Sequence, residues 1–291
     1  MNEIIRIENL THTYGEGTPF RRSAVENLSL DIYHGEFLGL IGHTGSGKST
    51  LVQHLNALLK PTLGSVYVNG LNLNDKDANL RDVRRAVGLV FQYPEYQLFE
   101  ETVRKDIAFG PNNLGLDAAD VEARVREAAQ IVGLSEDLLD RSPFDLSGGQ
   151  KRRVAIAGVL AMRPNVLVLD EPAAGLDPRG RREMLALVRD YHARGGVTVI
   201  MVSHSMDDVA RMCSRIIVMS HGKVAFDAPP AQVFAHGDEL AAMGLGIPAC
   251  AQLANRLREK GFAIPKGVFA LEELAGAIAA CLGAEGEDCH A

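Results

Sequence analysis

Apolar and polar residues alternate in two short runs near the start of the chain, Ile4–Ile7 and Ala24–Ile32. A period of two residues predicts half-buried β-strands, because successive side chains of a strand point to opposite faces. The next apolar run, Phe37–Ile41, is continuous and precedes a glycine-rich turn. A run of this kind is typical of a strand that is buried on both faces, as in a parallel sheet.

Further along, segments with helical spacing of apolar residues alternate with short apolar runs. Helices are expected over Thr50–Leu59, Ala118–Val132 and Arg181–Arg194, and strands over Ser65–Val68, Val87–Phe91, Val166–Leu169 and Val197–Val202. Asp117 is a suitable N-cap for the second helix, and Gly133 can end it. Strands that alternate with helices predict an α/β fold with a parallel sheet.

The pattern changes after Val224, where Pro229 and Pro230 interrupt the chain. Two amphipathic helices are expected beyond them. The first lies around Leu253 and Leu257, and the second places Leu271, Leu274, Ile278 and Leu282 on one face. We therefore expect a main domain over residues 1–230 and a small helical appendage over residues 231–291.

Composition and charge exclude several classes of protein. The formal net charge is −7, so a broad basic surface for nucleic acid is not expected. No apolar run reaches the roughly 18 residues of a membrane span, and the charged residues within Met1–Leu10 argue against a signal peptide. The cysteines are far apart in the sequence, at Cys213, Cys250, Cys281 and Cys289. This spacing indicates reduced thiols of a cytosolic protein rather than disulfides or a zinc site.

A glycine-rich segment between the strand at 37–41 and the helix at 50–59 has the chemistry for binding phosphate. It fits the pattern G-x-x-x-x-G-K-[ST] and is followed by Thr50; its residues are Gly42, His43, Thr44, Gly45, Ser46, Gly47, Lys48 and Ser49. Glycines let consecutive N–H groups face phosphate oxygens, and the helix N-terminus faces the same anion. Lys48 would neutralise the β- and γ-phosphates, and the Ser49 hydroxyl would ligate Mg²⁺. The flanking strand and helix distinguish this P-loop from a glycine-rich surface turn, so we expect ATP and Mg²⁺ to bind here.

Two acids, Asp170 and Glu171, follow the apolar strand at 166–169, where open α/β sheets place their ligands. Asp170 is expected to hold Mg²⁺ and Glu171 to polarise the attacking water as general base; the alternative is a pair of acidic turn residues. His204 follows the strand at 197–202 and would either donate to the γ-phosphate or cap a turn. Gln92 can reach Mg²⁺ or its water, although taken alone it would more often be an ordinary surface amide.

A second loop with two glycines, Leu146–Gln150, precedes the basic helix Lys151–Ala157 and is also suited to an anion. This Leu-Ser-Gly-Gly-Gln run resembles the signature motif of ATP-binding-cassette (ABC) proteins, and the resemblance covers about residues 3–228. It implies a P-loop NTPase fold of the ABC-cassette type with a helical signature subdomain over about 93–163. It further implies that each of two subunits covers the ATP held by the other. The resemblance assigns this covering role to Ser147, Gly148, Gly149 and Gln150, adenine stacking to Tyr14, the glutamine loop to Gln92, the aspartate loop to Asp177 and the switch histidine to His204.

A narrower resemblance rests on Phe91–Val103, Asp106–Pro111, Thr18–Phe20 and the appendage from Gly246 to Leu274. These segments are similar to the energy-coupling factor ATPases of vitamin and metal-ion uptake. The resemblance implies that the appendage helps to pair two ATPases, the second of which is a paralogue. It also implies that the segment after Gln92 receives a transmembrane coupling protein, which works with a substrate-binding membrane subunit. The chain would then be peripheral, at the cytoplasmic face of the cell membrane.

Two other functions remain open at this point. One is the ATPase of a different type of ABC transporter. The other is a non-transport clamp ATPase, a class that usually carries a long coiled-coil insertion or two cassettes in one chain, and neither feature occurs here. Intact Asp170, Glu171 and His204 argue against a non-catalytic scaffold, so we expect hydrolysis of ATP coupled to transport and no nucleic-acid partner.

Overall fold

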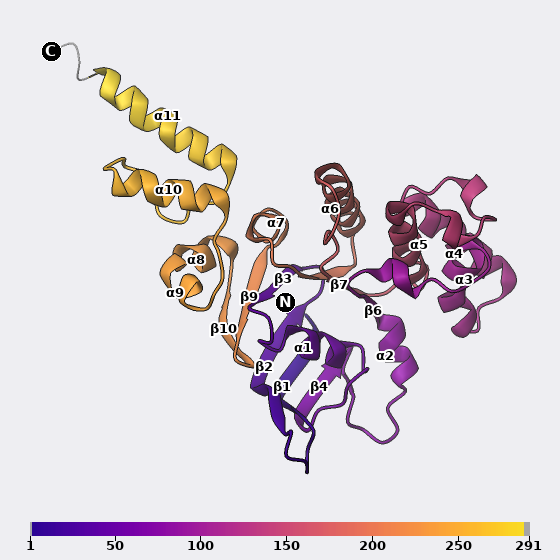
Figure 1. The fold of residues 1–291 in the computed structure, drawn as a ribbon. Helices are drawn as coiled ribbons and strands as arrows, with labels where there is room; N and C mark the ends of the chain where they lie inside the picture. The colour runs from indigo at the N-terminus through magenta and orange to yellow at the C-terminus, as the bar shows by residue number, and fades with distance from the viewer. Residues whose placement is uncertain (1, 288–291) are drawn as a thin grey trace.

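Two β-sheets form the centre of the fold in the computed structural model, which describes residues 2–287 (Figure 1). The first sheet has four strands in the order β2-β1-β4-β5. The second sheet has six strands in the order β10-β9-β3-β8-β7-β6. Helices α3, α4 and α5 lie together at one end of the molecule, and the C-terminal helices lie at the other end (Figure 1).

The four-stranded sheet is antiparallel throughout. Its strands are β1 (Glu3–Tyr14), β2 (Arg22–Tyr33), β4 (Leu63–Val68) and β5 (Leu71–Asn72). The strands predicted from alternation at 4–7 and 24–32 are confirmed, but both are longer than expected. They belong to this separate sheet and not to the parallel one, because their alternation leaves one face of each strand exposed.

The six-stranded sheet is parallel except for its edge strand β10, which pairs antiparallel with β9. Its strands are β3 (Phe37–Gly42), β6 (Val87–Val90), β7 (Val166–Asp170), β8 (Thr198–Val202), β9 (Arg215–Ser220) and β10 (Lys223–Ala228). Alternate residues of β3 enter two different cores, with Phe37 and Ile41 in one and Leu38 and Leu40 in the other. Burial on both faces explains why the strand is apolar throughout.

The described part of the chain up to Met212 contains seven α-helices. They are α1 (Lys48–Leu55), α2 (Leu80–Ala86), α3 (Val103–Asn113), α4 (Ala118–Ile131), α5 (Gly148–Leu160), α6 (Pro178–Ala193) and α7 (Met206–Met212). Short 3₁₀ turns are η1 (Pro94–Gln97), η2 (Glu136–Leu138) and η3 (Pro143–Asp145). The predicted cap of α4 is confirmed, since Asp117 accepts from the Asp120 N–H at 2.8 Å. The predicted extension of α1 to residue 59 is wrong, because Ala57 adopts a left-handed φ of 57°.

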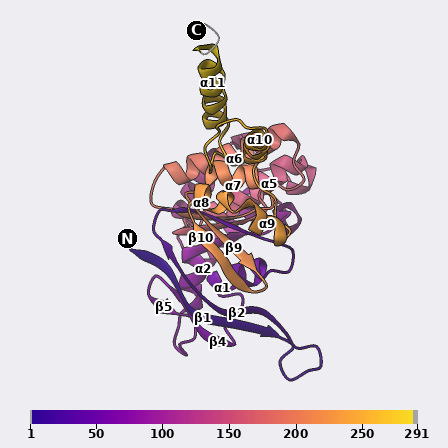
Figure 2. The ribbon, with the colours of Figure 1, turned by 90° about the vertical axis from the view of Figure 1, so that its left-hand side faces the viewer.

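The C-terminal part consists of α8 (Pro230–Ala235), α9 (Gly237–Ala242), α10 (Ala249–Glu259) and α11 (Leu271–Glu287). Helix α11 projects away from the body of the molecule (Figures 1 and 2). Leu274 joins a small core with α10 residues, whereas Leu271 and Leu282 are 66% and 56% exposed. The apolar face predicted for this helix is therefore only partly covered within residues 2–287. The last residues of the predicted appendage, 288–291, lie outside the described part, and so does Cys289.

Candidate nucleotide-binding and hydrolytic site

The P-loop connects the carboxyl end of β3 to the start of α1, as the sequence predicts. Gly47 caps the helix with a left-handed φ of 104°, and a Cβ at this position would lie 2.4 Å from the Ala24 carbonyl oxygen. A Cβ on Gly42 would lie 2.4 Å from the Met219 carbonyl oxygen. Both glycines are therefore required by close approach of neighbouring strands. This packing holds the loop's N–H groups at the head of the helix, where they can bind an anion.

Lys48 is nearly buried and its Nζ lies against the P-loop itself. The ammonium donates to the carbonyl oxygens of Gly42 at 2.7 Å and of His43 at 3.1 Å. Burial lowers the pKa of Lys48, while the carboxylates of Glu171 and Asp170 act in the opposite direction. These mutual effects indicate that the cation and the two acids face one site, which is the arrangement needed for a phosphate chain and a metal ion.

A hollow of about 220 Å³ adjoins the P-loop. It is lined by Tyr14, Arg22, Ala24, Gly45, Gly47, Lys48, Ser49 and Thr50. The Tyr14 ring is 43% exposed, and its hydroxyl lies 3.3 Å from the Thr50 Oγ1. An aromatic face beside a cation and backbone amides suits a nucleoside phosphate. Sequence reasoning missed Arg22, because it lies at the start of β2 and only the pairing of β2 with β1 brings it close to the P-loop.

The candidate hydrolytic residues, Glu171 and His204, follow two strands that are neighbours in the sheet, β7 and β8. Glu171 comes directly after β7 and has a left-handed φ of 52°, and its N–H donates to the Val202 carbonyl oxygen at 3.0 Å. The His204 Nε2 lies 3.6 Å from the Glu171 Oε1. Both side chains line a hollow of about 450 Å³. A strained conformation that places a carboxylate beside an imidazole is consistent with a catalytic pair.

Burial dominates the electrostatics of this pair. It raises the pKa of Glu171 to about 7, and the neighbouring charge of Asp170 adds to this effect. Burial also raises the pKa of Asp170, which Lys48 partly offsets. For His204, burial and the charge of Lys48 lower the pKa. A carboxylate whose pKa is near 7 is well matched to general-base catalysis at neutral pH, while the imidazole stays largely neutral.

The candidate ligands for Mg²⁺ are the Ser49 hydroxyl, the Asp170 carboxylate and the Gln92 amide. Oxygen ligands of this kind suit Mg²⁺, which is usually held by one or two carboxylates together with substrate phosphates. No cluster of three His, Cys, Asp or Glu side chains that could hold a metal by itself occurs in residues 2–287. Half-buried Asp170, with its raised pKa, supplies a carboxylate that a cation would stabilise. The donor set therefore fits a magnesium ion that binds together with a phosphate chain.

The second glycine-rich loop lies apart from this site. Ser147 is the N-cap of α5 and forms a capping box with Gln150, whose Oε1 accepts from the Ser147 N–H at 3.0 Å. Ser147, Gly148 and Gly149 are exposed, and no hydrogen bond in the described part of the chain joins them to the P-loop. Asp177 caps α6 by accepting from the Gly180 N–H at 2.6 Å. The chain thus gathers the P-loop, Tyr14, Asp170, Glu171 and His204, but it leaves the signature loop free to face another molecule.

Comparison with known proteins agrees with this arrangement. The family model of the ABC transporter matches residues 25–174. The energy-coupling factor transporter ATP-binding protein EcfA2 of Symbiobacterium thermophilum is 56% identical over 285 residues, covering 98% of this chain and 99% of that protein. The protein with the same description from Caldanaerobacter subterraneus subsp. tengcongensis is 54% identical over 269 residues, covering 92% of this chain and 94% of that protein.

Solved structures show the same fold. The cbiO1 protein of Clostridium perfringens, described as part of the ABC transporter complex cbiONQ, superposes with a TM-score of 0.74 at 35% identity, covering 90% of this chain and 98% of that one. The dimeric ATP-binding cassette MJ0796, bound to ADP and Pi, gives a TM-score of 0.69 at 31% identity, covering 77% and 98%. No helix in the described part of the chain has both the length and the apolar character that a bilayer crossing requires. The chain belongs to the ABC transporter family, as an ATPase of the energy-coupling factor group.

Proposed function

We propose that this chain is the ATP-hydrolysing subunit of an energy-coupling factor importer and powers uptake of a vitamin or metal ion. In this proposal residues 1–230 form the ABC ATPase domain, with its helical subdomain at about 93–163, and residues 231–291 help to pair two ATPases. The observation that carries the proposal is the separation of the two anion-binding loops. The P-loop lines the nucleotide hollow, whereas Ser147 and its neighbouring glycines are exposed elsewhere on the chain.

Within one subunit, each residue of the site has a separate role in binding or hydrolysing ATP. Tyr14 stacks on the adenine, and the P-loop amides together with Lys48 bind the phosphate chain. Glu171 takes a proton from the attacking water, and neutral His204 donates to the γ-phosphate and fixes that geometry. Ser49, Asp170 and Gln92 would hold Mg²⁺, which would supply positive charge to the phosphate chain. The protein contributes mostly positioning and charge, as expected for phosphoryl transfer.

The second ATP-binding face is completed across a dimer. Ser147, Gly148, Gly149 and Gln150 would cover the ATP held by a paralogous ATPase, and the paralogue's equivalent loop would cover the ATP held here. The N-terminus of α5 supports this role, since exposed N–H groups at a helix start bind anions. Asp177, at the start of α6, would communicate between the two subunits. ATP then stabilises the closed dimer only to the extent that it binds the closed state more tightly than the open one.

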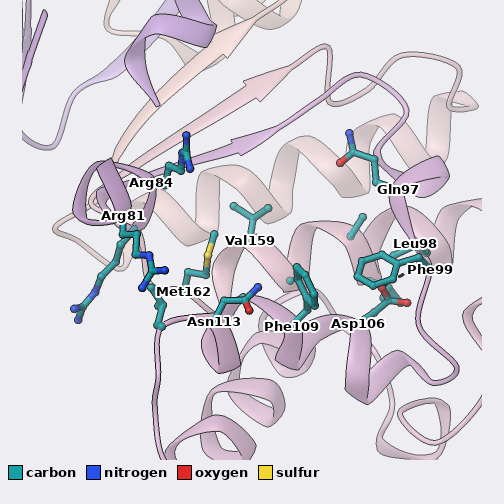
Figure 3. Close-up of a pocket in the computed structure, with 16 residues that line it drawn as sticks. Arg81, Arg84, Gln97, Leu98, Phe99, Asp106, Phe109, Asn113, Val159 and Met162 are labelled. Atoms are coloured by element: carbon teal, nitrogen blue, oxygen red, sulfur yellow. Dashed lines mark hydrogen bonds between the residues drawn. The ribbon is translucent and has the colours of Figure 1, made fainter. Parts of the chain in front are cut away.

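A groove beside helix α5 is the proposed docking site for the transmembrane coupling protein. It encloses about 540 Å³, and Figure 3 shows Arg81 and Arg84 at one end and Phe99 and Phe109 at the other. The two aromatic rings meet edge to face with centroids 4.9 Å apart, and both are about half exposed. An exposed apolar groove of this size suits a short helix of a partner protein. Docking there would hold the chain at the cytoplasmic face of the membrane, next to the substrate-binding membrane subunit.

Substitution of Ser147 by arginine tests the shared-site model. Ser147→Arg places a bulky cation on the face proposed to meet the paralogue's ATP, while the P-loop of the same chain is unchanged. We expect the isolated variant to bind MgATP as tightly as the unchanged protein, within about twofold. In the complex purified with its co-expressed neighbours, we expect ATP hydrolysis to fall by about 10²-fold, the scale of losing donors to a developing oxyanion.

Two results would contradict the shared-site model. The first is a loss of ATP affinity in the isolated Ser147→Arg chain, which would place this residue in the chain's own nucleotide site. The second is full ATP turnover by the isolated chain that does not change on dilution. Identification of the proteins that co-purify with the chain tests the proposed partners in the same experiment.

A further inference from the structure

A buried arginine, Arg152, lies in α5 five residues after Ser147 and is only 3% exposed. Its guanidinium forms a bidentate pair with Glu95, through Nε to Oε2 at 3.0 Å and Nη2 to Oε1 at 2.8 Å. The third nitrogen, Nη1, donates to the carbonyl oxygens of Ala174 at 2.7 Å and Pro172 at 3.3 Å. The Tyr93 ring lies 5.9 Å from the Arg152 Cζ. One side chain therefore joins three segments of the chain, its own helix α5 included.

Each of these segments has a place in the proposed reaction. Glu95 belongs to η1, which follows Gln92 and ends at Gln97, a residue that lines the docking groove (Figure 3). Pro172 and Ala174 belong to the loop directly after Glu171. The remaining segment is helix α5, which begins at the signature loop and carries Arg152. The guanidinium thus lies between the surface proposed to meet the membrane partner and the loop that carries the general base.

The energetics of this contact make it sensitive to change. Burial raises the pKa of Glu95, but the hydrogen bonds and charge of Arg152 outweigh burial and hold the pKa below its ordinary value. Removing one partner of a buried ion pair is costly, because the other charge stays desolvated. Glu171 needs support from its surroundings as well, since its left-handed φ of 52° is unfavourable for a residue with a side chain.

We propose that Arg152 is a positioning residue that fixes the loop after Glu171 relative to η1, so that movement of the docked membrane partner changes the placement of the general base. This inference rests on the role of Glu171 in the proposed function. It adds a route between the docking groove and the catalytic carboxylate that consists of one guanidinium, one carboxylate and two backbone carbonyl groups. Arg152 does not touch the nucleotide in this scheme and acts only through the loop.

The test is ATP hydrolysis by the complex purified with its co-expressed membrane partners. Arg152→Gln should lower kcat by about 10- to 100-fold, which is less than the roughly 10²- to 10⁴-fold contribution of the general base that it positions. KM for MgATP should stay within about twofold, because the residue lies outside the nucleotide hollow. Arg152→Lys keeps the charge but lacks the planar fork that binds Glu95 and both carbonyls together, so it should recover only part of kcat.

A double-mutant cycle separates positioning from general loss of structure. On a Glu171→Gln background, Arg152→Gln should cause no further fall in the residual rate, because the carboxylate through which it acts is already gone. A further fall of the same size on that background would overturn the proposal. Glu95→Gln keeps an oxygen that can accept from the guanidinium and leaves both carbonyl contacts in place, so it should lower kcat less than Arg152→Gln.

Arg163→Gln is the matched control, because Arg163 also pairs through two nitrogens with a glutamate, Glu127, but contacts neither η1 nor the loop after Glu171. Its kcat should stay within about twofold of the unchanged complex, and an equal loss in this control would overturn the proposal. An unchanged kcat in Arg152→Gln would also overturn it. If Glu171→Gln alone retains normal turnover, the failure lies instead in the proposed function.

Discussion

The raised pKa of Glu171 predicts a distinctive pH profile for ATP hydrolysis. With a pKa of about 7, the carboxylate is about 9% ionised at pH 6, half ionised at pH 7 and about 91% ionised at pH 8. Only the ionised form can accept a proton from water. Because kcat/KM reports the ionisation of the free enzyme, it should rise about tenfold between pH 6 and pH 8. An exposed glutamate with an ordinary pKa would give a flat profile over this range.

The assay is initial-rate release of phosphate by the co-expressed complex, with Mg²⁺ in excess at each pH. Glu171→Gln is the control, since it keeps the shape of the side chain but cannot act as a base. The variant should bind MgATP, accumulate as a closed dimer and turn over about 10²- to 10⁴-fold more slowly, the usual contribution of a general base. Its residual rate should lack the rise between pH 6 and pH 8, so any titration of the nucleotide itself is measured in the same experiment.

Three outcomes would refute this reasoning. A flat profile of the unchanged complex between pH 6 and pH 8 would mean that Glu171 is already ionised at pH 6 or is not the base. The same tenfold rise in the Glu171→Gln complex would assign the titration to another group. Near-normal turnover by that variant would remove Glu171 from the mechanism altogether.

Three further results are expected from single substitutions. Gly47→Ala should destabilise the chain by about 1–3 kcal/mol or more, since it strains a left-handed residue and meets the Ala24 carbonyl; thermal unfolding measures this, with Gly276→Ala in open space on α11 as the control. Tyr14→Ala should raise KM for ATP about 5- to 150-fold, equivalent to about 1–3 kcal/mol of base stacking, while Tyr14→Phe should not. The raised pKa of Glu171 means that its ionisation lowers the stability of the folded state as pH rises from about 4.5 through 7. Glu171→Gln should therefore unfold at a higher temperature than the unchanged chain at pH 8, and at a similar temperature near pH 4.5.

The sequence predicts the parallel strands and the loops that follow them, because their signals are local. A continuous apolar run gives β3, and the glycines and Lys48 after it give the P-loop. Helix α3 gives a weak pattern, since Gly110 and Pro111 lie within it and Phe109 faces the groove rather than the core. The antiparallel sheet was not separated from the parallel one, because strand pairing depends on contacts between distant segments.

Site residues follow the same division. Glu171 and His204 are predictable because each lies within two residues of the end of a buried strand. Arg22 and the Arg152–Glu95 pair give no local signal. Arg152 belongs to a run of basic residues that would ordinarily be exposed, and Glu95 is 57 positions away in the sequence. Only the packing of α5 against η1 brings these two charges together and excludes water from them.

The order of strands in the six-stranded sheet sets the spacing between the P-loop and Glu171. Strand β8 lies between β3 and β7, so the segment that carries His204 begins between the P-loop and Glu171. Since neighbouring strands are about 4.8 Å apart, the strand ends that carry the P-loop and Glu171 lie about 10 Å apart. This distance is fixed by the backbone hydrogen bonds that join β3 to β8 and β8 to β7. Insertion of residues into a surface loop or a helix between these strands would therefore not change it. The sheet, and not the side chains proposed to hold the nucleotide, therefore determines how long a phosphate chain must be to reach from the P-loop to Glu171.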